Sequence, residues 1–67
     1  MTVDRVREIR AWATVLAGTC EDYVHHPTSY GNLMIQGAMR NLAEAMDRAL
    51  TEELSTPSEE KTLPQVQ

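Results

Sequence analysis

The apolar side chains of residues 32–54 recur every three or four positions, and no proline interrupts them. This spacing predicts a helix with one apolar face. The face consists of Ile35, Ala38 or Met39, Leu42, Ala45 or Met46, Ala49 or Leu50, and Leu54. Arginine and glutamate alternate at four-residue steps on a more polar face, at Arg40, Glu44, Arg48 and Glu52. One helix cannot bury its own apolar stripe, so the rest of the chain must supply a partner.

A second amphipathic segment precedes it and starts after Thr2, which can cap a helix. Its apolar residues alternate between steps of three and four, as in the a and d positions of a heptad repeat. They are Val6, Ile9, Ala13, Leu16, Cys20 and Tyr23, with Trp12 widening the stripe on one flank and Ala17 and Val24 on the other. Glycine costs roughly 1 kcal/mol relative to alanine inside a helix, so Gly18 predicts a close helix crossing.

The segment between the two stripes predicts a turn. Pro27 has no amide hydrogen and disfavours a helical conformation in the residue before it, so the first helix should end near His25. Thr28 or Ser29 can cap the second helix. A cap at Ser29 starts that helix near residue 30, whereas a cap at Asn32 starts it near residue 33. The sequence leaves both open.

These patterns predict an all-α fold, an antiparallel two-helix hairpin with helices over about 3–25 and 30–54. The hairpin occupies residues 1–54, and the polar, proline-containing residues 55–67 predict a disordered tail. The chain has no Phe and few large side chains, whereas ordering each residue costs about 1.5 kcal/mol. We therefore expect hairpins to assemble into a homo-oligomeric helical bundle. Its buried positions should include Leu42, Met46, Leu16 and Trp12.

Charge and composition narrow the range of partners. The net charge of −4 argues against nucleic acid polymers and anionic membranes as partners, because both select basic surfaces. The clustered Arg5, Arg7 and Arg10 still permit a local anion site. The single Cys20 fits a reducing compartment, and no apolar run approaches the ~18 residues of a membrane helix. We expect a cytoplasmic protein without a membrane partner.

The sequence offers no motif for catalysis or metal binding. His25 and His26 are adjacent and would point apart on a helix, unlike the paired ligands of zinc sites. Cys20 lies on the apolar stripe, which predicts a buried and unreactive thiol. We therefore expect no enzyme activity, no metal site and no cofactor.

Several short elements resemble the helical hairpin of phage anti-CBASS proteins that act as cyclic-nucleotide sponges. They are Glu8-Ile9-Arg10, Ala13, Leu16-Ala17, Pro27-x-Ser29 and Leu42-x-Glu44-Ala45, spanning about residues 8–50. The distance from the proline to the last element is longer here, and the tryptophan-containing stretch expected after it is absent. The resemblance implies an oligomer of hairpins that captures small cyclic nucleotides in the host cytoplasm without cleaving them.

A cyclic nucleotide needs cations or amides for its phosphates and flat side chains for its bases. The candidate ligand-binding residues are Tyr30, His26, Thr28 and Ser29 at the turn and Arg40 further along the second helix. In an oligomer, Arg5, Arg7 or Arg10 of a neighbour can complete the pocket.

The alternative is a helical protein-interaction module that docks its apolar stripe on another protein. An antitoxin-like inhibitor, an assembly chaperone and a phage protein that binds a host protein all belong to this class. A helix-turn-helix DNA-binding domain does not fit, because the third helix and a basic recognition face are missing.

Overall fold

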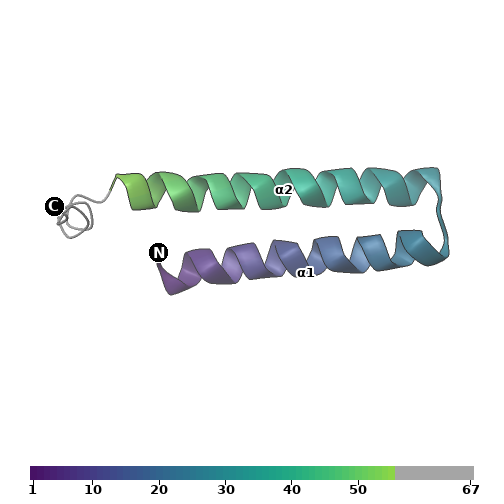
Figure 1. Cartoon of the computed structure of the whole chain (residues 1–67), viewed down its shortest axis with the longest axis horizontal. Helices are drawn as coiled ribbons and strands as arrows, with labels where there is room; N and C mark the ends of the chain where they lie inside the picture. The colour runs from purple at the N-terminus through teal and green to yellow at the C-terminus, as the bar shows by residue number, and fades with distance from the viewer. Residues whose placement is uncertain (56–67) are drawn as a thin grey trace, which may run out of the picture.

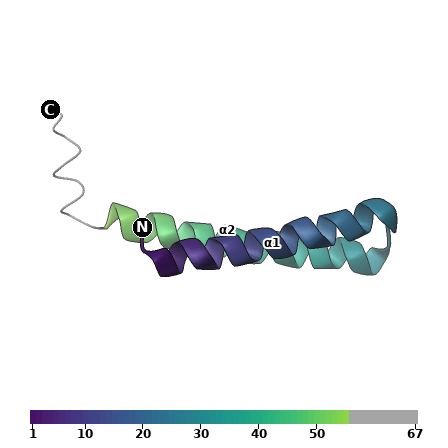
Figure 2. The same cartoon turned by 90° about the horizontal axis from the view of Figure 1, so that it is seen from below.

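The computed structural model describes residues 1–55, which form two helices and no strand. Helix α1 spans Val3–His25 and α2 spans Ser29–Leu54. They lie side by side as a helical hairpin, with the N-terminus beside the end of α2 (Figure 1). Seen from below, they cross at a shallow angle (Figure 2). The predicted all-helical hairpin is confirmed; the predicted tail, apart from Ser55, lies outside the described residues.

Threonine caps both helices at their N-termini. Thr2 accepts a hydrogen bond from the Arg5 amide at 3.2 Å, and Thr28 accepts one from the Gly31 amide at 2.9 Å. Of the three candidate caps for the second helix, the structure therefore uses Thr28, and α2 begins one residue earlier than a Ser29 cap would give. A cap at Asn32 is excluded because its amide already donates to the Thr28 carbonyl, at 3.0 Å, within the first turn.

Small side chains on α2 form the centre of the contact between the helices. Ala38, Ala45 and Ala49 are buried, with 4 %, 0 % and 1 % of their surface exposed. Opposite them, α1 contributes half-buried residues, among them Ile9, Trp12, Leu16 and Tyr23. Alanine lets two helices approach closely, but it contributes little apolar area of its own.

The predicted apolar stripe of α1 is only partly correct. Ile9, Leu16, Cys20 and Tyr23 are half-buried, as expected for the contact face. Val6 and Ala13 are exposed, however, and Trp12 and Thr19 are half-buried instead. The apolar residues of α1 cover a wider arc than one neighbouring helix can bury. Turning the large Trp12 ring inward removes more apolar area from water than turning Ala13 inward.

The expected close crossing at Gly18 is wrong for the hairpin. A Cβ atom added to Gly18 would meet nothing within 4 Å. The tight glycine is Gly31, where an added Cβ would lie 3.1 Å from Thr28 Oγ1 and 3.3 Å from Tyr23 Cδ1. The crowded glycine is therefore the one at the turn, beside the cap of α2, and not Gly18.

We predict that Thr28→Ala destabilises the hairpin by about 1 kcal/mol, because the Gly31 amide loses its acceptor. Urea unfolding followed by circular dichroism measures this change. Ser29→Ala is the control, since Ser29 lies next in the chain but does not cap α2. Equal effects of the two substitutions would contradict the assigned cap.

Candidate functional site

Four charged side chains join the start of α1 to the end of α2. Glu8 Oε1 accepts from Arg5 Nη1 at 3.0 Å, and Glu8 Oε2 accepts from Arg48 Nη2 at 2.5 Å. Arg5 Nη2 also donates to Glu52 Oε2 at 2.6 Å. The charges alternate along this ion-pair network, so each arginine touches only carboxylates within it. The N-terminal amino group pairs with Glu53 close by.

The network shifts the pKa values of its members. The hydrogen bond from Arg48, aided by that from Arg5, holds the pKa of Glu8 below its usual value of 4.5. The hydrogen bond from Arg5 lowers the pKa of Glu52 in the same way, and the two glutamates raise the pKa of Arg5. All these side chains are at least partly exposed, so solvent screens their interactions. The network fixes which residues lie opposite each other more than it adds stability.

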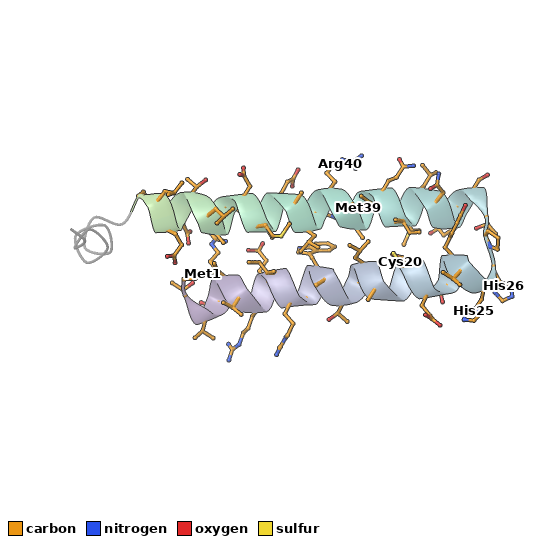
Figure 3. The ribbon with its side chains drawn as sticks, in the orientation of Figure 1. Met1, Cys20, His25, His26, Met39 and Arg40 are labelled. Carbon is orange, nitrogen blue, oxygen red and sulfur yellow. The ribbon has the colours of Figure 1, made fainter. Side chains whose placement is uncertain are left out.

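The turn holds a cavity of about 360 Å³. It is lined by Thr19, Asp22, Tyr23, His26, Thr28, Tyr30, Gly31 and Met34. Three of the five predicted ligand-binding residues, Tyr30, His26 and Thr28, are thus brought together. Ser29 and Arg40 are not among the lining residues. Arg40 projects from α2 on the side away from α1 (Figure 3).

The cavity has an acidic character that the sequence pattern did not reveal. Asp22 lines it, and residues 11–39 contain no lysine or arginine. The Thr28 hydroxyl already accepts a hydrogen bond from the Gly31 amide, so that amide is not available to a phosphate. A phosphate bound here would meet the Asp22 carboxylate, and any arginine would have to come from elsewhere. Sequence reasoning missed Asp22 because it lies in the last turn of α1, four residues before His26, rather than in the turn between the helices.

The two histidines differ in their surroundings. His25 Nε2 lies 2.9 Å from Glu21 Oε2, one helical turn earlier, whereas His26 lines the cavity. Within residues 1–55, no group of three or more His, Cys, Asp or Glu side chains is placed to hold a metal ion.

A polar face follows from the ion pairs and the cavity. Glu8 and Arg48 are bonded to each other across the helices, so both lie on one side of the hairpin. Asp22 follows Glu8 by two heptads, close to four full turns of α1, and therefore lies on the same side. We call this side, with the Glu8–Arg48 pair at one end and the cavity at the other, the polar face.

An apolar face covers the opposite side. Val6 lies about 160° around the α1 axis from Glu8, on the other side of the contact with α2. Met46 lies about 160° around the α2 axis from Arg48 in the same way. A groove of about 240 Å³ on this side is lined by Met1, Ile9, Met46, Ala49 and Leu50. We define the apolar face by Val6, Ala13, Ala17 and Val24 of α1 and by Ile35, Met39, Leu42, Met46 and Leu50 of α2.

Most of the apolar face is exposed in the single hairpin. Met46, Met39 and Leu50 have 42 %, 54 % and 57 % of their surface in solvent. No large side chain among residues 1–55 is fully buried. Neither described helix is long and apolar enough to cross a membrane. The structure therefore leaves several large apolar side chains on one open surface that both helices share.

No protein-family model matches this chain, and no curated protein and no solved structure matches it significantly. The resemblance to cyclic-nucleotide sponges therefore stays a prediction from short motifs. Function must be inferred from the geometry of the two faces.

We predict that lowering the pH from 7 to 3 lowers the melting temperature of the wild type more than that of Glu8→Gln. The folded-state pKa of Glu8 lies below the unfolded value of 4.5, so its stabilisation is complete above that value and is lost as the pH falls through the folded pKa. Glutamine cannot titrate, so the variant lacks this loss. Thermal melts by circular dichroism measure the difference.

Glu44→Gln is the matched control, because Glu44 makes no ion pair within residues 1–55 and should retain the wild-type response. An identical acid response of the wild type and Glu8→Gln would show that the Glu8 pairs have no energetic role.

Proposed function

We propose that this chain is a non-enzymatic binding protein whose antiparallel hairpins assemble through the apolar face into a homo-oligomeric helical bundle. The supporting observation is the exposed apolar face, to which both helices contribute side chains. The contact between the two helices, by comparison, buries only alanines completely. Removing apolar surface from water contributes roughly 25 cal/mol per Å², so covering this face is the main stabilisation still open to the chain.

Assembly through the apolar face leaves the polar face outward. The cavity at the turn then opens to solvent in every copy, and the ion-pair network stays hydrated. Such a bundle is a scaffold that presents several identical polar surfaces, which suits binding better than catalysis. A helical segment of another protein that docks on the same face would be the protein-interaction alternative.

A second candidate function is the capture of a cyclic nucleotide at the turn. The observation that favours it is the cavity that Tyr30, His26 and Thr28 share. The exposed Tyr30 ring can stack on a base. Because Asp22 lines the cavity, the phosphates would need an arginine of a neighbouring copy that lies outside the docked surface, such as Arg7. This candidate therefore depends on the oligomer.

We predict that the wild type elutes as an oligomer and that Met46→Glu dissociates it towards the 7.5 kDa chain. The reason is that an unpaired carboxylate in an apolar contact costs more than the contact returns. Leu42→Asp should act in the same way. Size-exclusion chromatography with light scattering gives the molar mass at micromolar concentration.

Val15→Glu is the matched control. Val15 is 43 % exposed, almost the same as Met46, but it lies midway between Glu8 and Asp22 on the polar face. It should leave the molar mass unchanged. A monomeric wild type, or equal dissociation by both glutamates, would refute assembly through the apolar face.

We predict that Tyr30→Ala weakens binding of a cyclic dinucleotide or trinucleotide by roughly five- to hundredfold, because one stacked base is worth about 1–3 kcal/mol. Tyr30→Phe keeps the ring and should bind like the wild type. Arg40→Ala should remove about 1.5–3 kcal/mol if its guanidinium reaches a phosphate in the oligomer. Calorimetry with a panel of cyclic nucleotides measures each affinity. A Kd weaker than about 1 mM for the whole panel would leave only the protein-interaction function.

A further inference from the structure

The α1 residues of the apolar face, together with Arg10 and Glu21 at its edge, form a stripe with an internal symmetry. Side chains at equal distances from the middle of the stripe are alike in size, and the two charged ones have opposite sign. Read from either end, it runs from a valine through a charged residue to an alanine: Val6, Arg10 and Ala13 in one half, and Val24, Glu21 and Ala17 in the other. The two halves mirror each other about a point near residue 15. The charge is positive in the first half and negative in the second.

We infer that a second copy of this chain docks on the apolar face about a two-fold axis that passes near residue 15 of α1. The inference rests on the proposed oligomer and specifies its geometry. In this dimer, each α1 lies antiparallel to the α1 of the other copy. Arg10 then faces Glu21 of the partner subunit, Ala13 faces Ala17 of the partner subunit, and the valines meet at both ends.

The exposed charges of α1 support this pairing. Arg10 is exposed, and its guanidinium makes no ion pair within residues 1–55. The Glu21 side chain is 72 % exposed and, within residues 1–55, pairs only with the exposed His25 of the same helix. A two-fold axis makes the Arg10–Glu21 pair twice. Rim charges of this kind fix the orientation and register of an interface more than its affinity.

The apolar stripe of α2 also has a centre of symmetry. This centre lies opposite the centre of the α1 stripe along the length of the hairpin. Ile35, Met39, Leu42 and Met46 are symmetric about a point between residues 40 and 41. The Glu8–Arg48 and Arg5–Glu52 ion pairs place residue 15 of α1 level with about residue 41 of α2, because each step forward along α1 is a step back along α2. One axis therefore serves both helices, and α2 also pairs with its own copy, bringing Met39 against Leu42 of the partner subunit.

The size of the face is sufficient for a dimer. The 23 residues of α1 span about 34 Å, and two adjacent helices of roughly 10 Å each make a face about 20 Å wide. The footprint of ~700 Å² is close to the ~800 Å² per partner of a standard stable interface. The small Ala13 and Ala17 at the centre let the two α1 helices approach closely. Longer methionines and leucines fill the space between the α2 helices.

A charge-swap experiment tests this geometry. Arg10→Glu puts two glutamates opposite each other on each side of the axis, and Glu21→Arg puts two arginines there. Each variant alone should dimerise at least tenfold more weakly than the wild type. An equimolar mixture should restore wild-type affinity, because every facing pair then has opposite charges. Native mass spectrometry detects the heterodimer, and analytical ultracentrifugation gives the affinities.

Two controls separate this two-fold geometry from a different arrangement of the two copies and from a loss of folding. Arg7→Glu makes the same charge change off the apolar face, so it should neither dissociate the dimer nor prefer Glu21→Arg in a mixture. Circular dichroism measures folding. Variants that are unfolded alone and regain helix only when mixed support the inference as well as folded variants that dimerise only when mixed.

A monomeric wild type refutes the oligomer itself. An oligomeric wild type whose two variants assemble normally, or without preference for each other, refutes only the axis.

Discussion

Two helices share only one contact surface, and this constraint governs the whole structure. A side chain at that contact is covered on one side by its neighbour and on the other by its own helix, so only residues as small as Ala38, Ala45 and Ala49 disappear from solvent. Larger side chains remain partly exposed whichever way the helices turn. The hairpin therefore divides its surface into an apolar and a polar face, and it cannot hide the first one by itself.

The two ends of the hairpin are held by different means. At the turn, the Thr28 cap and the tight approach at Gly31 fix how the chain reverses. At the open end, Glu8 lies between two arginines and links α1 to α2 by charge. The alanine contact between these ends carries little information about register, because one alanine can replace another along the helix. The polar contacts therefore determine which residues of the two helices lie level.

Much of the fold could be predicted from the sequence, because helix periodicity and proline act locally. The ends of α1 and the end of α2 follow from Thr2, Pro27 and the loss of apolar spacing after Leu54. Which residues of α1 face α2 could not be predicted as well, since Trp12 and Ala13 compete for the contact and only three-dimensional packing decides. The cavity was half foreseen: Tyr30, His26 and Thr28 are neighbours in the chain, whereas Asp22 and Met34 join them only after folding.

The sulfur atoms of the apolar face make it chemically vulnerable. Met39 and Met46 are both substantially exposed, so a peroxide in solution can reach their thioethers. Oxidation to methionine sulfoxide turns a flexible apolar side chain into a polar one. Any partner that covers this face therefore protects the methionines from oxidation. In an uncovered hairpin, oxidation would make the apolar face more polar and weaken its binding to a partner. Oxidation of these methionines would therefore weaken any assembly formed through the apolar face.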